Sequence, residues 1–229
     1  MRSPVAWILL FDSNIETIPR EITGDRSLAK VAKGQRSKGT EQIILDRSIH
    51  HFAMRRLSGG LARGRPDIAH ISILGVTDTP AYASGTVRLL IHTTGDRLIE
   101  PANRWRPPRN YRNFLGLMEA LMEVGRVPPR GKPILELETG SIEDAVSRTK
   151  AEQVVLLSSH GQLCDLREKV ESLKGRLVTY LIGAYAKGEP RVEVVSVADE
   201  VVSIHPSSLS SSVVVARLLY EIERTTGHL

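Results

Sequence analysis

The sequence is poor in cysteine and lacks long apolar runs, and both shortages limit what the protein can be. Cys164 is the single cysteine among 229 residues, so the chain forms no internal disulfide and one thiol cannot build a zinc site on its own. We expect it inside a core helix rather than as a nucleophile. No apolar run approaches the roughly 18 residues of a membrane span. Val5 to Phe11 is short and Asp12 follows it without a cleavage site, which predicts a first strand, not a signal peptide, and a cytoplasmic protein.

Nucleotide-binding motifs are also missing. The chain contains no G-x-G-x-x-G, so the dinucleotide fingerprint is absent. Gly125, Gly131 and Lys132 resemble a phosphate loop, but their spacing is one residue too long and Pro133 stands where magnesium binding needs a hydroxyl. The seven histidines do not form a set of metal ligands. We therefore expect neither a nucleotide fold of these types nor a metal site.

What the sequence does contain is a succession of strand and helix signals. With 41% apolar and 25% charged residues, the chain can bury a full core. Strands are expected at these ranges: Val5–Phe11, Gln42–Asp46, His70–Val76, Val87–His92, Pro133–Glu138, Val154–Leu157, Val178–Ile182 and Val192–Ile204. A basic, proline-broken loop is expected from Asp96 to Arg109. The order is mostly strand then helix, which predicts an α/β sheet with helices on both faces and a ligand site at the carboxyl ends of its strands.

Helix signals are clearest at three places. Asp46 or Ser48 can cap a helix that runs to about Leu57, and Ser141 followed by Asp144 resembles another helix start. The strongest signal is an apolar stripe at i, i+3, i+4, i+7 and i+8 that ends at Gly125: Phe114, Leu117, Met118, Leu121 and Met122. Two further helices are expected, one leading from about Gly161 to Lys174 and one after Ser212.

Positive charge is concentrated in the first two thirds of the chain. Residues 1–150 hold 23 Lys or Arg against 16 Asp or Glu, whereas residues 151–229 hold 8 against 10. Two arginine clusters stand out, the second interleaved with Trp105 and Tyr111: Arg55, Arg56, Arg63 and Arg65, then Arg104, Arg106, Arg109 and Arg112. Guanidinium groups bind phosphate and aromatic faces stack bases, so this pattern indicates nucleic-acid binding, with a solvated basic face as the alternative.

Small and polar residues follow three apolar runs in the last third of the chain. Ser158–Gly161, Gly183–Gly188 and His205–Ser212 come directly after expected strands. Glycine lets a ligand approach the backbone closely, and serines at a helix start offer hydroxyls beside unpaired N–H groups. These loops predict a cofactor pocket, and ordinary strand-to-helix connections are the alternative.

Six segments in order carry a resemblance to a known family. They are LDRSIHH with AMRRL (Leu45–Leu57), GRPDI (Gly64–Ile68), IHTTGDRLI (Ile91–Ile99), PRNYRNFLGLMEAL (Pro108–Leu121), LIGAYAKG (Leu181–Gly188) and SIHPSSLSSSVVVARLL (Ser203–Leu219). The chain resembles, over nearly its whole length, the archaeal form of the ribosome-biogenesis pseudouridine N1-methyltransferases of the SPOUT class. The resemblance implies a single SPOUT domain over residues 1–229 with a C-terminal trefoil knot, an exception to the rule that chains do not thread loops.

The resemblance also implies an activity, a cofactor and partners. The protein is expected to be a homodimer that methylates N1 of a pseudouridine in a hairpin of small-subunit ribosomal RNA, using S-adenosylmethionine. Basic RNA-binding insertions are expected at about 47–67 and 97–113, and the knotted cofactor-binding part at about 150–229. The implied cofactor-binding residues are Leu157, Ser158, Leu181, Ile182, Gly183, Gly188, Ile204, Ser207, Ser208, Leu209 and Ser210. The implied RNA-binding residues are Arg65, Arg106, Arg109, Arg112 and Asn113.

Two positions depart from the family pattern, and one role stays open. Asn113 stands where the family carries a basic residue, with Arg112 adjacent, and the 184–187 loop reads Ala-Tyr-Ala-Lys where the archaeal family has phenylalanine, proline and histidine. Asp67 is the candidate base for the N1 proton, but an acid two residues from Arg65 is expected rather to be its ion-pair partner. Loss of the proton to water is a further option.

Two other functions compete with this one. A non-catalytic rRNA-binding assembly factor would keep the fold and the basic face without turnover, although the glycines and serines of the expected pocket argue against it. A SPOUT enzyme that methylates a ribose hydroxyl would need an arginine near the cofactor, and the later loops offer Arg191.

Overall fold

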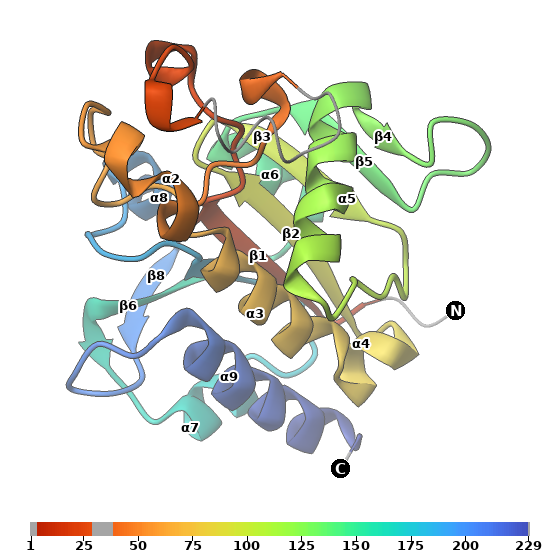
Figure 1. Cartoon of the computed structure of the whole chain (residues 1–229). Coiled ribbons are helices and arrows are strands. Elements are labelled where there is room, and N and C mark those ends of the chain that lie inside the picture. The colour runs from red at the N-terminus through yellow and green to blue at the C-terminus, as the bar shows by residue number, and fades with distance from the viewer. Residues whose placement is uncertain (1–3, 29–38, 229) are drawn as a thin grey trace.

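An eight-stranded mixed sheet organises the chain in the computed structural model, which describes residues 4–28 and 39–228 (Figure 1). The strand order is β4-β5-β3-β2-β1-β7-β6-β8. The strands are β1 Ala6–Ser13, β2 Val87–Thr93, β3 Arg97–Pro101, β4 Arg126–Val127, β5 Leu135–Thr139, β6 Gln153–Leu163, β7 Val178–Gly183 and β8 Glu200–Ser203. The pairs β2–β1, β1–β7, β7–β6 and β6–β8 are parallel. The pairs β4–β5, β5–β3 and β3–β2 are antiparallel.

Strand β1 lies in the middle of the sheet, and every one of its eight residues is buried. It pairs in parallel with β2 on one side and β7 on the other, with Leu10 opposite both Ile91 and Ile182. A strand covered on both faces needs a continuous apolar run rather than an alternating one, and Val5–Phe11 has that run. The carboxyl ends of β1, β2 and β7 therefore meet at the same edge of the sheet.

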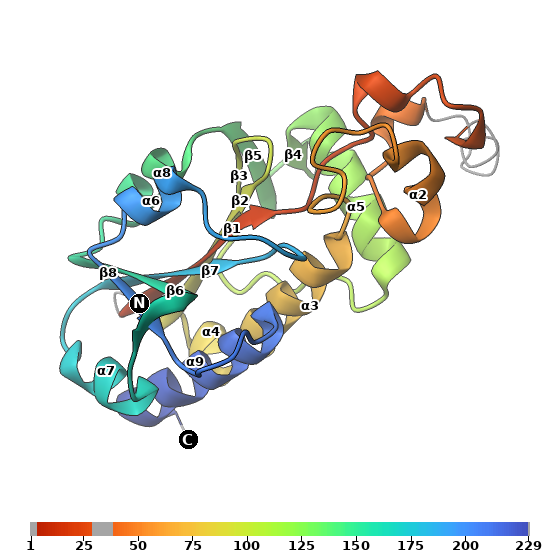
Figure 2. The same cartoon turned by 90° about the vertical axis from the view of Figure 1, so that its left-hand side faces the viewer.

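Helices cover both faces of the sheet, as the sequence predicts (Figure 2). One face carries α6 and α8, and the other carries α3, α4, α5, α7 and α9, each layer closing its own apolar core. The helix bounds are α2 Arg47–Met54, α3 Pro66–Thr77, α4 Pro80–Ser84, α5 Tyr111–Val124, α6 Ile142–Thr149, α7 Leu166–Ser172, α8 Val192–Ser196 and α9 Ser211–Thr226, with 3-10 turns η1 Arg20–Ile22 and η2 Thr40–Gln42. Among these described residues, no helix is long and apolar enough to cross a bilayer.

Three helix boundaries confirm the capping signals. The Asp46 carboxylate accepts the Ser48 N–H (2.8 Å) at the start of α2, which ends at Met54, three residues before the predicted end. Helix α5 ends at Gly125, whose φ of +80° is a conformation that glycine adopts without strain. Ser141 and Asp144 form a reciprocal capping box at the start of α6.

The predicted strand over His70–Val76 is wrong, because these residues lie in helix α3. Pro66 occupies the first helical position, where its missing N–H costs nothing, and Asp67 lies in the first turn. Ala69, Ile73 and Val76 are fully buried at helical spacing. The β-branched residues favoured a strand, but their spacing and the packing of α3 against β1, α5 and α9 decide for a helix.

Two other segments differ from expectation. Gln42–Asp46 holds the end of η2 and one isolated bridge, between Thr17 and Ile44, rather than a strand. Val192–Ile204 is not one strand but divides into α8 and β8. Asp199 fixes the start of β8, because its side chain accepts the Val154 N–H (2.7 Å) and its own N–H donates to the Val154 carbonyl.

Two further corrections concern strands that the sequence understated. Arg97–Pro101 forms β3 instead of a loop, pairing with both β2 and β5. Strand β6 continues to Leu163, so Cys164 precedes α7 instead of lying within a helix, and it is half-buried against the core. Burial raises the pKa of its thiol, which is consistent with the expected structural role.

Candidate functional site

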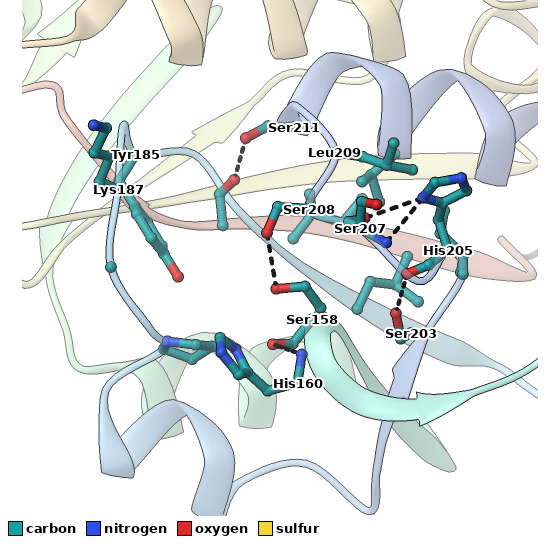
Figure 3. Close-up of a pocket in the computed structure, with 18 of the residues that line it drawn as sticks. Ser158, His160, Tyr185, Lys187, Ser203, His205, Ser207, Ser208, Leu209 and Ser211 are labelled. Atoms are coloured by element: carbon teal, nitrogen blue, oxygen red, sulfur yellow. Dashed lines mark hydrogen bonds between the residues drawn. The ribbon is translucent and has the colours of Figure 1, made fainter.

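A cavity of about 330 Å³ opens at the carboxyl ends of β6, β7 and β8 (Figure 3). Nine residues expected at the cofactor line it: Leu157, Ser158, Ile182, Gly183, Gly188, Ile204, Ser207, Ser208 and Leu209. Leu181 and Ser210 do not line it. Leu181 is fully buried in the core on the α6 side, because side chains alternate along β7, and Ser210 is the N-cap residue of α9.

Eleven further residues line the cavity. Seven of them lie in the three loops that the sequence predicted as the pocket, although none was singled out: Ser159, His160, Tyr185, Ala186, Lys187, His205 and Ser211. Sequence reasoning missed the other four, which are Phe11, Pro190, Ser203 and Val214. Phe11 is different, because it reaches the cavity through the pairing of β1 with β7, where it stands opposite Gly183. A contact across about 170 residues of sequence leaves no local signal.

Gly183 keeps one wall of the cavity closed. A Cβ atom placed there would lie 2.5 Å from Cε1 of Tyr185 and 3.2 Å from Cζ of Phe11. Those two rings contact each other with centroids 5.7 Å apart. Burial raises the pKa of the Tyr185 hydroxyl to about 12, so it stays protonated at neutral pH. At the other end of the loop Gly188 has a φ of +119°, which a residue with a side chain rarely adopts.

The opposite wall is polar and includes the start of helix α9. Figure 3 shows Tyr185 and Lys187 on one side of the cavity and His205 and Ser207 on the other. The Ser211 hydroxyl donates to the Gly183 carbonyl and so fixes the start of α9 to the end of β7. The Ser210 side chain bonds with Ser212 Oγ (3.3 Å) rather than capping the first turn. The amino end of α9 therefore presents N–H groups and a positive dipole beside the cavity.

Arg191 fastens the cavity loop to the ends of β1 and β2. Its guanidinium donates to both carboxylate oxygens of Asp12 (3.1 and 2.7 Å) and to Asp96 Oδ1 (3.4 Å). Asp96 Oδ1 also lies 3.0 Å from Nε2 of His92, whose side chain is fully buried. Asp12 holds a φ of +48°, an uncommon conformation for a residue other than glycine. With two carboxylates on its guanidinium, Arg191 is not available as the free arginine that ribose methylation would need.

Arg65 and Asp67 form a bidentate ion pair at the start of α3. Arg65 Nε lies 2.8 Å from Oδ1 and Nη2 lies 2.7 Å from Oδ2 of Asp67. The hydrogen bond from Arg65 is the main reason that the pKa of Asp67 is lowered. A carboxylate with a lowered pKa and both oxygens bonded is a weak base at neutral pH.

Arg109 lies at the other end of α3 and bonds Asp78, the C-cap residue of that helix (Nη2–Oδ1 3.1 Å). Twelve helical residues at a rise of about 1.5 Å separate the two ends by about 18 Å. His70 Nε2 lies 2.8 Å from the Pro108 carbonyl oxygen and holds the Arg109 loop against α3. Arg106 is exposed, and Arg112 and Asn113 are exposed in the first turn of α5. Helix α3 thus spaces the predicted RNA-binding arginines.

The described residues hold no cluster of three or more His, Cys, Asp or Glu side chains that could bind a metal ion. His92, Asp12 and Asp96 lie close together, but their polar atoms have other partners. Both carboxylates accept from Arg191, and His92 Nδ1 accepts the Asp12 N–H.

A family model, relatives from other organisms and a solved structure all indicate the same family. A family model described as EMG1/NEP1 methyltransferase matches residues 8–223. The chain is 37% identical over 216 residues to a ribosomal RNA small subunit methyltransferase Nep1 from Methanothrix thermoacetophila, covering 94% of each chain. It is 33% identical over 228 residues to the Nep1 of Staphylothermus marinus, covering 97% of this chain and 96% of that one. The crystal structure of Archaeoglobus fulgidus Nep1 bound to S-adenosylhomocysteine superposes with a TM-score of 0.86 at 31% identity, covering all of both chains.

Two buried histidines predict how stability depends on pH. Burial is the main cause of a lowered pKa at both His92 and His50, compared with an ordinary value of 6.5. The unfolded chain then binds more protons below pH 6.5, so the free energy of unfolding should fall as the pH drops below that value, by up to about 1.4 kcal/mol per pH unit for each histidine. Denaturant titrations from pH 7.5 to 5 should show a shallower fall for His92→Gln. The exposed His160→Gln control should keep the wild-type fall, and equal slopes in all three proteins would contradict the assignment.

Proposed function

The chain belongs to the EMG1/NEP1 methyltransferase family, and we propose that it methylates N1 of a pseudouridine in a hairpin of small-subunit ribosomal RNA. It is an rRNA methyltransferase with S-adenosylmethionine as the methyl donor. The pseudouridine and its N1 atom are the finer part of the proposal. The observation that carries methyl transfer is the cavity at the ends of β6, β7 and β8, whose lining includes nine residues expected at the cofactor, and the pseudouridine target rests on the family resemblance.

The lining of this cavity fits the cofactor. Its volume of about 330 Å³ lies within the range of small-molecule sites. Leu157, Ile182 and Leu209 offer apolar surface suited to an adenine ring, and the Ser158 and Ser208 hydroxyls can bond ribose or amino groups. The amino end of α9 suits a carboxylate. When bound, the cofactor supplies a methyl group activated by a positively charged sulfur.

The chemical demand on the chain's own residues is then mainly positional. A methyl on sulfonium needs no further activation, so holding it in line with the RNA nitrogen supplies most of the rate. The Arg191 contacts with Asp12 and Asp96 keep the cavity loop in one place, and Ser211 keeps the start of α9 in register with β7. We assign Asp67 to orienting Arg65 rather than to proton removal, because both of its oxygens bond that guanidinium. The N1 proton then leaves to water.

Several larger features belong to the same proposal and rest on family resemblance. We infer one domain over residues 1–229 with a trefoil knot at about 150–229, and the return of the chain from edge strand β8 to Gly183 on β7 supports such a path. We also infer a homodimer in which the basic face of one subunit binds RNA beside the cofactor of its partner. A cytoplasmic location, together with the ribosomal substrate, is part of the same inference. The alternative of an assembly factor predicts RNA binding without methyl transfer, so a measurement of turnover tests it.

Replacing Gly183 should remove cofactor binding. In Gly183→Val the new side chain collides with the ring of Tyr185 and displaces the wall shared with Phe11, so the affinity for S-adenosylmethionine should fall at least tenfold in calorimetric titration. Gly116→Val is the matched control, because Gly116 lies exposed on α5 and an added Cβ would meet no atom within 4 Å apart from its chain neighbours and the backbone of its own helix. A folded Gly183→Val protein that binds as tightly as the control would refute the site. Absence of binding by the wild type would refute the function.

Arg65 and Asp67 should affect RNA binding in different ways. Arg65→Ala should weaken binding of a pseudouridine hairpin and flatten the plot of log affinity against log salt by about 0.7, the value for one phosphate of single-stranded RNA. Asp67→Ala should weaken binding with little change of slope, since the guanidinium loses its anchor but keeps its charge. Arg176→Ala, at the amino end of β7, should change neither quantity.

The opposite result would assign Asp67 a different role. If the Asp67 variant binds RNA normally but loses turnover in single-turnover methylation, and regains it as the pH rises, Asp67 is the base and the orienting role is wrong.

A further inference from the structure

Helix α2 lies in the basic segment 47–67 that is expected to bind RNA, and it carries an exposed aromatic and cationic face to which no specific contact has been assigned. The Phe52 ring is 57% exposed on this face. Its neighbours are cationic or can become so: the His51 ring lies with its centroid 4.1 Å away, and the Arg55 guanidinium carbon lies 5.2 Å from the centroid. The opposite face of α2 buries Ala53 and Met54 in a separate apolar cluster. Phe52 therefore faces solvent because of how the helix is anchored.

The anchoring of α2 is firm and connects it to the Arg65 segment. Tyr111 donates to the Asp46 carboxylate at the helix start (2.6 Å), which ties α2 to α5. The Arg47 N–H donates to the Gly64 carbonyl (2.8 Å), one residue before Arg65, and its guanidinium bonds the Gly60 carbonyl. The exposed face of α2 is thus fixed next to an arginine that we assign to RNA.

The charge of this segment is strongly positive. Residues 47–65 contain five arginines and two histidines but no aspartate or glutamate. Arg63 is paired with Glu16, and Arg56 lies 3.8 Å from Asp25. Within residues 4–28 and 39–228, no carboxylate lies within 4 Å of the Arg55 guanidinium, which rests on the Phe52 ring instead. An unpaired cation beside an exposed ring is the combination that binds single-stranded nucleic acid, since the ring stacks a base and the cation takes a phosphate.

We propose that the outer face of α2 binds a single-stranded segment of the RNA substrate, with one base stacked on Phe52 and a neighbouring phosphate on Arg55. The identity of the ligand as RNA rests on the proposed function. A second copy of this chain is the weaker occupant, because a symmetric contact would bring two acid-free arginine segments together. Ile49 and Leu61, 48% and 83% exposed, widen the apolar surface available to the base.

Salt dependence separates stacking from charge. With a 12-nucleotide single-stranded RNA as the probe, Phe52→Ala should weaken binding about tenfold at every salt concentration and leave the slope of log affinity against log salt unchanged. Phe52→Leu should weaken binding similarly, because it keeps apolar bulk but loses the π-face. Arg55→Ala should flatten the slope by about 0.7. Tyr220→Ala, which removes a 53% exposed aromatic on α9, is the matched control and should bind normally. A blunt duplex should not distinguish Phe52→Ala from wild type.

A tryptophan at the same position reports stacking directly. Both natural tryptophans, Trp7 and Trp105, are at least 94% buried, so Phe52→Trp adds the exposed fluorophore. RNA should quench its emission beyond any change in the wild type, and an abasic oligomer should not.

Three outcomes would overturn the stacking site: unchanged RNA affinity in Phe52→Ala, no added quenching in Phe52→Trp, or a loss of self-association in Phe52→Ala by sedimentation without a loss of RNA affinity. If the wild type neither binds S-adenosylmethionine nor transfers methyl, the proposed function fails instead, and the Phe52 measurements still decide the RNA contact.

Discussion

The burial of β1 between β2 and β7 is the constraint on which the rest of the structure depends. Its parallel pairing brings Phe11, Asp12 and the end of β2 to the edge where β7 delivers Gly183. Because glycine stands opposite Phe11, the Phe11 and Tyr185 rings can meet and close one side of the cavity. The Asp12 carboxylate then accepts from Arg191, and this contact fixes the cavity loop that follows β7. The cavity therefore depends on the register of β1 against its neighbours, because a shift of one residue would turn these side chains to the opposite face of the sheet.

The proposed RNA-binding face depends on a different element. Helix α3 separates Arg65 from Arg109 by its own length, and acids at its two ends, Asp67 and Asp78, bond the two guanidinium groups. These pairs are partly exposed, so they add little to stability, and their consequence is to hold the side chains in position. Helix α2 extends this face through the bond between Tyr111 and Asp46. One face thus combines spaced cations with an exposed ring.

Local sequence signals predicted the elements whose causes are local. The run of β1, the cap at Asp46, the stripe of α5 and the capping box at Ser141 all appear as expected. Two of the three predicted cavity loops, 183–188 and 205–212, follow strand ends as expected, whereas Ser158–Gly161 lies within β6. The errors lie where tertiary packing decides. His70 to Val76 has strand-forming residues but helical burial, and β3 is a strand because β2 and β5 flank it. Phe11 at the cavity and the bonds between Asp12 and Arg191 join residues about 170 to 180 apart in sequence, which no local pattern reports. The roles of the binding residues themselves came from family resemblance.

The measurement that tests the central claim most directly is methyl transfer to two hairpin RNAs that differ only in pseudouridine or uridine at one loop position. The wild-type protein, given S-adenosylmethionine with a labelled methyl group, should label the pseudouridine hairpin alone, and nuclease digestion with mass spectrometry should locate the label on the base as N1-methylpseudouridine. Equal labelling of the uridine twin, or label on a ribose, would contradict the proposed target. Tight binding of both RNA and cofactor with no transfer to either hairpin would show that the protein assembles on RNA without catalysing this reaction.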